Sequence, residues 1–148
     1  MVPKSPIPTR ISVVTPTLRR PQEVRELLQN LAAQTLPAFE FILVDGAPEG
    51  EEATRAVAEQ EFSKTSFPCH YLRHGGGTAI QRNVGIAAAQ GDFIALIDDD
   101  IRLEPSFLKE IAKVFGFCES HICQMHAKAI LAIRSHLDQY ENRTLSTA

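Results

Sequence analysis

The sequence is poor in cysteine and has no long apolar run, and each shortage excludes a class of protein. Its three cysteines (Cys69, Cys118 and Cys123) are too few, and odd in number, for a disulfide framework, so a reducing compartment is expected. The longest apolar stretches fall far below the roughly 18 residues that would span a bilayer. The first ten residues contain three prolines and lack the apolar core of a signal peptide. These features predict a soluble, cytoplasmic protein.

The sequence also lacks clusters of like charge. The net charge is −3, and the basic and acidic residues are mixed along the sequence, so neither a nucleic-acid groove nor a charged tail is expected. There is no Gly-x-Ser-x-Gly and no Walker-type loop, which leaves serine hydrolases and P-loop enzymes without support. At 148 residues the chain can form one compact domain with a real core.

What the sequence does contain is an alternation of apolar strand-like runs with helical periodicity. Val24, Leu27, Leu28 and Leu31 follow the spacing of one helix face. We expect strands at residues 11–15, 41–45, 69–72 and 93–97. Further helices are expected at about 51–60 and 79–89, and from Pro105 with a buried face of Phe107, Leu108, Ile111, Val114 and Phe115. This order predicts an α/β fold with an open, largely parallel Rossmann-like sheet flanked by helices.

Polar residues follow three of these predicted strands. In parallel α/β sheets, ligands bind beyond the carboxyl ends of the strands. Thr15, Asp45 and Asp98 stand at those ends, so we expect them along one edge of the sheet. The architecture therefore predicts an acidic site there.

The triplet Asp98-Asp99-Asp100 is the strongest part of this site. In an extended segment Asp98 and Asp100 point one way and Asp99 the other. Two neighbouring carboxylates repel each other unless a cation or a proton lies between them, and oxygen ligands favour Mg²⁺ or Mn²⁺. The alternative is a solvated acidic turn that caps the helix near Pro105.

Two further features belong to the predicted site. Arg82 begins the helix that follows the Gly75-Gly76-Gly77 turn, where free backbone N–H groups and a fixed positive charge would meet phosphate. Asp45 precedes Gly46, which allows close approach of the backbone, although a lone aspartate can also simply cap the next turn. Together with a metal, these groups suit a nucleoside diphosphate conjugate.

Over about residues 10–115 the sequence resembles the glycosyltransferase family 2 enzymes with the GT-A fold. The segments that carry the resemblance are SVVTPTLRRPQEVRELLQNLAAQTLPAFEFILVDGAPEG and GGGTAIQRNVGIAAAQGDFIALIDDD. The second contains an Arg-Asn-x-Gly helix and ends in a motif similar to the family's Asp-x-Asp. The resemblance implies a donor nucleoside diphosphate sugar, with a UDP-sugar favoured, and an acceptor such as a glycan or a lipid-linked molecule.

The resemblance also implies roles for individual residues. Thr15 would line the nucleotide pocket, with Arg19 near the diphosphate. Asp45 would accept a hydrogen bond from the base, and Gly77 and Arg82 would flank the nucleotide.

For the acidic triplet, the resemblance places Asp98 near the ribose and the metal, Asp99 near the donor sugar, and Asp100 as the main ligand of Mn²⁺ or Mg²⁺. Two departures leave the base specificity open. Gly46 stands where many relatives have a second acidic residue, and residues 47–50 replace the usual Ser/Thr-Asp-Gly turn.

The resemblance divides the chain into an N-terminal arm (1–9), a GT-A nucleotide-sugar-binding domain (10–116) and a C-terminal helical tail (117–148). The tail has apolar residues at the spacing of an amphipathic helix: Ile122, Met125, Ala129, Ile133, Leu137 and Tyr140. Whether it covers a sheet edge, mediates self-association or is an aberrant ending of a shortened gene stays open, and no general base is assigned in it.

Three functions remain in competition. The first is glycosyl transfer from a nucleoside diphosphate sugar. The second is a nucleotide-sugar and metal-binding module that lacks the base and acceptor site needed for transfer. The third is a phosphohydrolase with Asp98 or Asp100 as nucleophile, which usually carries its aspartates after the first strand and not after the fourth.

Overall fold

The computed structural model describes residues 10–115. The chain divides into two compact units, residues 1–113 and 114–148, and the sheet described below belongs to the first. The predicted arm (1–9) and helical tail (117–148) lie outside the described residues. No helix among the described residues is long and apolar enough to cross a membrane.

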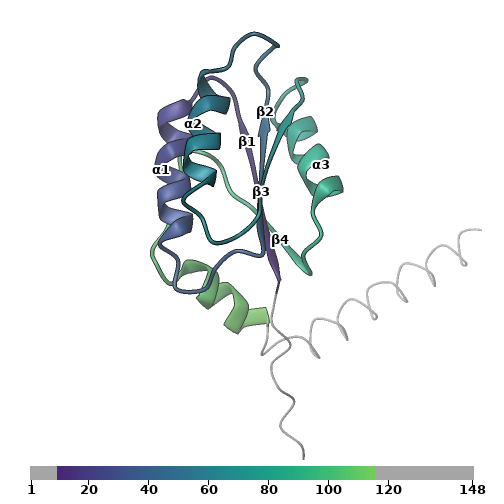
Figure 1. Ribbon diagram of the computed structural model, residues 1–148. Coiled ribbons are helices and arrows are strands. Elements are labelled where there is room, and N and C mark those ends of the chain that lie inside the picture. Colours follow the sequence, from purple (N-terminus) through teal and green to yellow (C-terminus); the bar gives the residue numbers. More distant parts are fainter. Residues whose placement is uncertain (1–9, 116–148) are drawn as a thin grey trace, which may run out of the picture. The chain divides into compact units, whose positions relative to one another are not determined.

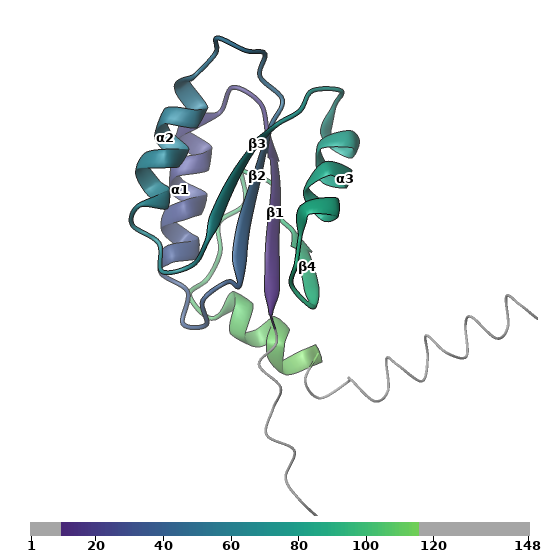
Figure 2. The same ribbon diagram turned by 45° about the vertical axis from the view of Figure 1, so that its right-hand side comes forward.

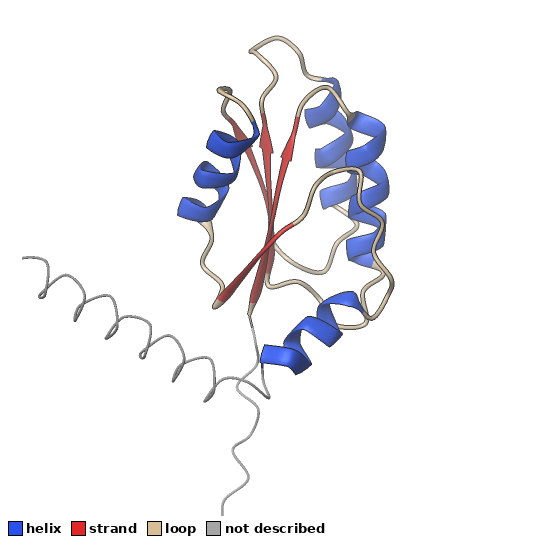
Figure 3. Cartoon of the chain, turned by 180° about the vertical axis from the view of Figure 1, so that it is seen from behind, coloured by secondary structure: helices blue, strands red, loops and turns tan. Residues whose placement is uncertain are grey.

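A four-stranded parallel sheet forms the centre of the first unit, with the strand order β3-β2-β1-β4. The strands are β1 (Ile11–Thr17), β2 (Glu40–Asp45), β3 (Cys69–Arg73) and β4 (Phe93–Leu96). They form one layer between the helices when the molecule is seen from behind (Figure 3). From β1 to β3 each new strand is added on the same side, whereas β4 is added on the other side of β1. The direction of strand addition therefore reverses between β1 and β4.

Helices cover both faces of the sheet. The labelled helices are α1 (Pro21–Ala32), α2 (Ala53–Phe62) and α3 (Thr78–Ala88), and residues 107–115 are also helical. α1 and α2 lie on one face and α3 on the other (Figures 1 and 2). This is the open parallel sheet flanked by helices that the alternating sequence pattern predicted.

The core follows from the two-residue alternation of the strands. On one face Val13, Phe41 and Leu43 pack with the buried stripe of α1, of which Val24 and Leu27 are fully buried. A second, smaller cluster lies on the α3 face, with these buried members: Val14, Ile42 and Val44. All residues of β1 and β2 are buried, because both strands are covered on both faces. This double covering explains why the two strands are mostly apolar along their whole length.

Pro16 marks the place where β1 and β4 separate. The carbonyl of Val14 accepts a hydrogen bond from Ile97 N–H on the β4 side, whereas that of Thr17 accepts one from Gly46 on the β2 side. Backbone groups of successive residues point alternately to the two neighbouring strands, so the backbone nitrogen of Pro16 points toward β4. Pro16 lies beyond the last β1–β4 pair, and its missing N–H therefore removes no hydrogen bond between the strands. A crevice can therefore open between the two strands at this point.

Most predicted elements are found within two residues of their expected bounds. The first strand was expected to end at residue 15, but β1 continues through Pro16 to Thr17. The last strand was expected to end at Ile97, but β4 ends at Leu96. The prediction that Val114 belongs to a buried helix face is wrong, since it is 58% exposed.

Candidate functional site

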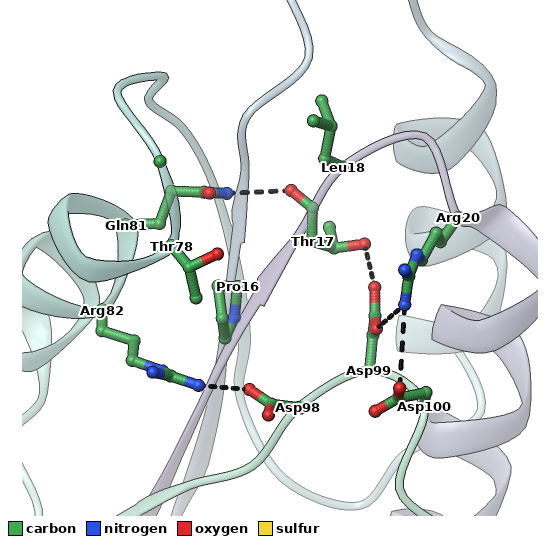
Figure 4. Close-up of a pocket in the computed structure, with 11 residues that line it drawn as sticks. Pro16, Thr17, Leu18, Arg20, Thr78, Gln81, Arg82, Asp98, Asp99 and Asp100 are labelled. Atoms are coloured by element: carbon green, nitrogen blue, oxygen red, sulfur yellow. Dashed lines mark hydrogen bonds and ion pairs between the residues drawn. The ribbon is translucent and has the colours of Figure 1, made fainter.

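A cavity of about 390 Å³ opens at the carboxyl ends of β1 and β4. This is the point of chain reversal in the sheet, where parallel α/β folds bind their ligands. The residues that line it come from the end of β1, the start of α3 and the turn after β4 (Figure 4): Pro16, Thr17, Leu18, Arg20, Gly77, Thr78, Gln81, Arg82, Asp98, Asp99 and Asp100.

The three aspartates lie in a turn and not in an extended strand. Ile101 N–H donates to the carbonyl of Asp98, which closes the turn. Burial nevertheless alternates as predicted, because Asp98 and Asp100 are exposed while Asp99 is 5% exposed. Asp99 points toward the end of β1, and the other two carboxylates remain accessible from the cavity (Figure 4).

Two arginines neutralise this acidic turn. Arg82, which lines the cavity, donates to Asp98 at 2.6 Å. Arg20 donates to Asp99 at 3.2 Å and lies 3.8 Å from Asp100. The repulsion among the carboxylates, which led us to expect a cation, is thus relieved by the protein's own guanidinium groups.

The N-terminus of α3 borders the same cavity. Gly77 is the N-cap residue with φ +98°, a conformation that favours glycine. Thr78 follows it at the cavity wall, and the first N–H groups of a helix have no partner within the helix. This part of the cavity, beside Arg82, has the geometry that suits an anion.

Three residues that the resemblance placed at the nucleotide do not line the cavity. Thr15 is completely buried and its hydroxyl has no hydrogen-bond partner among residues 10–115. Arg19 forms a two-pronged pair with Glu51, at 2.5 and 2.7 Å, and neither residue lines the cavity. Asp45 is also completely buried.

Both carboxylate oxygens of Asp45 accept hydrogen bonds from within the protein. Its Oδ1 accepts a hydrogen bond from Ala47 N–H at 2.9 Å, and its Oδ2 accepts one from the hydroxyl of Tyr71 at 2.6 Å. Burial, followed by this hydrogen bond to Asp45, raises the pKa of Tyr71 to about 12, so the phenol keeps its proton at neutral pH. Asp45 thus anchors the turn after β2.

Sequence reasoning missed six lining residues: Pro16, Thr17, Leu18, Arg20, Thr78 and Gln81. Thr17 and Arg20 carried a readable signal, because each follows a predicted strand end within a few residues, as the chosen residues did. Gln81 carried none, since a glutamine one helical position before an arginine has no chemistry that points to a site.

A model of the family described as glycosyl transferase family 2 matches residues 12–135 of the chain. The chain belongs to glycosyl transferase family 2. An uncharacterized glycosyltransferase of Haemophilus influenzae is 34% identical over 106 residues, which are 70% of this chain and 34% of that protein. Poly(ribitol-phosphate) β-N-acetylglucosaminyltransferase TarS of Staphylococcus aureus is 29% identical over 113 residues, or 76% of this chain and 19% of TarS. The chain therefore spans about a third or less of these family 2 relatives.

Solved structures agree with this family 2 assignment. A crystal structure of S. aureus TarS in complex with UDP-GlcNAc matches with a TM-score of 0.62 at 29% identity, covering 72% of this chain and 31% of that one. The mannosyltransferase PcManGT of Pyrobaculum calidifontis, in complex with GDP-Man and Mn²⁺, matches with a TM-score of 0.57 at 23% identity over 74% of this chain and 32% of that one, a likeness of fold alone. The GT-A-like fold of the family is thus present here.

Proposed function

We propose that the cavity binds a nucleoside diphosphate sugar, with a UDP-sugar favoured, as the donor of a glycosyl transfer. The observation that carries the proposal is the convergence of Arg82, the N-terminus of α3 and three aspartates on one cavity at the chain reversal of the sheet. The binding of UDP-GlcNAc by TarS, a family 2 relative, supports the same class of ligand. The acceptor, for which a glycan or a lipid-linked molecule is expected, and the cytoplasmic location remain predictions from the sequence.

A divalent metal fits the residues present, provided that the nucleotide shares its coordination. Asp98 and Asp100 are hard oxygen donors with accessible side chains, 49% and 60% exposed. Among residues 10–115 no three His, Cys, Asp or Glu side chains are grouped to hold a metal by themselves. Mg²⁺ is commonly bound by one or two carboxylates together with substrate phosphates, so Asp100 and Asp98 would hold Mg²⁺ or Mn²⁺ mainly in the presence of the diphosphate.

The chain's own groups would then orient and neutralise the donor. Arg82 and the N–H groups that begin α3 would bind the diphosphate, and both stand in place before the ligand arrives. A bound Mg²⁺ or Mn²⁺ would supply Lewis-acid stabilisation of the departing diphosphate. Asp99, held by Thr17 and Arg20, would keep the acidic turn in position.

A catalytically incomplete binding module is the second candidate. It is favoured by one observation, that the only carboxylates among the described lining residues are the three aspartates, and each contacts an arginine. Since Asp98 and Asp100 are proposed to hold the metal and Asp99 is buried, no carboxylate in the described lining is left to act as a general base toward an acceptor. The two candidates share the donor site and differ in transfer.

Calorimetry of the 148-residue chain with UDP, with and without Mn²⁺, tests the shared part. We expect UDP to bind more tightly with Mn²⁺, and Asp100→Asn to lose about tenfold or more in that affinity, as for one charge-assisted contact. Asp92→Asn is the matched control, because Asp92 pairs with Arg10 before β4 begins and does not line the cavity. Absence of metal-dependent UDP binding in the unmodified chain contradicts the proposal.

Release of UDP from UDP-sugars, with and without candidate acceptors, separates the two candidates. A transferase releases UDP faster when an acceptor is present. A binding module retains metal-dependent affinity for UDP and releases none above the rate without protein.

A further inference from the structure

Gln81 is a buried amide at the wall of the cavity, only 4% exposed. Its Nε2 donates two hydrogen bonds, each of 2.8 Å, to the carbonyl oxygens of Thr17 and Val44. These carbonyls belong to the carboxyl ends of β1 and β2, so the side chain spans the two strands. Figure 4 shows the bond to Thr17.

The orientation of this amide is fixed by its partners. Two carbonyl oxygens can be satisfied only by the NH₂ group, because the amide oxygen would repel them. A rotation that exchanged Nε2 and Oε1 would leave both carbonyls facing an acceptor. Among residues 10–115 no donor contacts Oε1, so Gln81 presents a hydrogen-bond acceptor that cannot turn into a donor.

Gly46 makes room for this arrangement. A Cβ atom at position 46 would lie 3.1 Å from Nε2 of Gln81 and 3.3 Å from its Cδ and Oε1. A larger side chain here would press on the amide. The departure at Gly46, where a second acidic residue was expected from the family pattern, therefore coincides with a neutral amide occupying that space from α3.

The alternative acceptor in this region is engaged elsewhere. Asp45, expected to meet the base, is fully buried and binds Ala47 N–H and the Tyr71 hydroxyl through its two carboxylate oxygens. It does not line the cavity, whereas Gln81 does. The acceptor that a base can reach is consequently on α3 and not at the end of β2.

We propose that Oε1 of Gln81 selects the base of the nucleotide by accepting a hydrogen bond from a ring N–H, as uracil offers at N3. Cytosine has an unprotonated, accepting nitrogen at that ring position, so two acceptors would face each other without a proton between them. A site built to bond an N–H rejects the analogue that lacks it, because its own polar group is left unpaired. This inference rests on the proposed donor-binding function.

Titration calorimetry with UDP and CDP in the presence of Mn²⁺ tests the inference, since the two ligands are equal in size. The unmodified chain is expected to bind UDP about tenfold more tightly than CDP or better. Gln81→Met, which keeps the length and removes the acceptor, is expected to reduce this preference to about twofold or less. Asp45→Asn is the matched control and retains the preference.

The outcomes separate this inference from the function on which it rests. If the unmodified chain binds neither nucleotide, the donor-binding proposal itself fails. If it binds both equally, or if the preference survives in Gln81→Met and disappears in Asp45→Asn, donor binding stands and the role of Gln81 is overturned.

If Gln81→Met does not fold, a modified ligand tests whether the ring N–H of the base is recognised. UDP methylated at N3 lacks the ring N–H, and we expect both the unmodified chain and Asp45→Asn to bind it about tenfold or more weakly than UDP. A penalty for the methyl group that is present in the unmodified chain and absent in Asp45→Asn would instead assign the acceptor to Asp45.

Discussion

The hydroxyl of Thr17 donates a hydrogen bond to Oδ2 of Asp99 across 2.8 Å and joins the end of β1 to the turn after β4. Both side chains are buried, at 4% and 5% exposure, so water does not replace the bond readily. The two strands have already stopped pairing at this point, since their last pair is Val14 with Leu96. This side-chain bond therefore holds the two walls of the crevice together.

Replacing Thr17 by valine should destabilise the fold by about 1–3 kcal/mol, because a buried carboxylate oxygen loses its donor. The substitution changes the shape of the side chain little and removes only the hydroxyl. Urea unfolding followed by circular dichroism measures the change in the free energy of unfolding. A variant as stable as the unmodified chain would show that the bond contributes nothing.

Thr15→Val is the matched control and should not destabilise the fold. The Thr15 hydroxyl is buried without a partner among residues 10–115, so its removal should be neutral or stabilising by up to about 1 kcal/mol. UDP affinity should not change, because Thr15 does not line the cavity. A marked loss of UDP binding in Thr15→Val would restore the role that the family resemblance implied.

Arg82 and Arg19 should differ sharply in their contribution to nucleotide binding. Arg82→Gln removes a guanidinium from the cavity wall and should lower UDP affinity about tenfold or more, as expected for a charge-assisted contact to phosphate. Arg19→Gln removes a guanidinium that binds Glu51, and should change UDP affinity about twofold or less. Calorimetry at two salt concentrations measures both, and equal losses in the two variants would contradict this geometry.

Gly85 sets how closely α3 packs on the sheet. A Cβ atom at this position would lie 2.3 Å from Cγ1 of Val14 and 3.3 Å from Cγ2 of Val44. Gly85→Ala should therefore cost about 1–3 kcal/mol by overpacking, although alanine is the better helix former at an exposed position. Thermal or urea unfolding measures the cost.

A double variant isolates the cause of that cost. Val14→Ala removes the methyl groups that the new Cβ would strike, so Gly85→Ala should be less harmful in the Val14→Ala background than alone. Additive losses would show that the two positions do not interact.

Glu40 should make the fold sensitive to acid. Burial alone would raise the pKa of Glu40, but hydrogen bonds from Gln90 N–H and the Ser12 hydroxyl outweigh it and hold the pKa below its ordinary value. The imidazole of His70, 3.4 Å away, acts in the same direction. The folded state then binds this proton less readily than the unfolded chain does.

The sign of the pH dependence follows from this lowered pKa. The stabilisation by ionised Glu40 is present above the unfolded pKa of about 4.3 and is lost as the pH falls through the lower folded pKa. Glu40→Gln, whose amide oxygen can still accept both hydrogen bonds, should lose less stability between neutral pH and about pH 3.5. Exposed Glu49→Gln should follow the unmodified chain, and an identical acid loss in Glu40→Gln would contradict the assignment.

The fold was readable because its signals are local. Val24, Leu27, Leu28 and Leu31 follow helical spacing, and all four are buried in α1. The run of residues 41–45 is apolar because β2 is covered on both faces, which a parallel sheet requires. The exact strand ends were less readable, since Pro16 is tolerated in β1 only because β4 no longer pairs there.

The sequence predicted the chemical character of the site better than it predicted which residues line the cavity. Arg82, Gly77 and the three aspartates line the cavity, while Thr17 and Arg20 line it in place of the predicted Thr15 and Arg19. Strand alternation directs Thr15 and Thr17 to the same face, and residue spacing alone does not tell that Thr17, which bonds Asp99, is the one that lines the cavity. Arg19 has φ +54°, and the direction of the chain after this left-handed residue carries Arg20, not Arg19, to the aspartates.

By itself, the sequence determined the succession of strands and helices, the parallel sheet and the edge at which carboxylates gather, because each depends on residue spacing and strand direction. Only the tertiary structure decided which of those polar groups remain available. Tyr71 engages Asp45 from 26 residues away, and Gln81 fills the space beside Gly46 from another element. A hydrogen bond between distant segments leaves no periodic trace in the sequence, and it is such bonds that separate structural polar residues from those a ligand can reach.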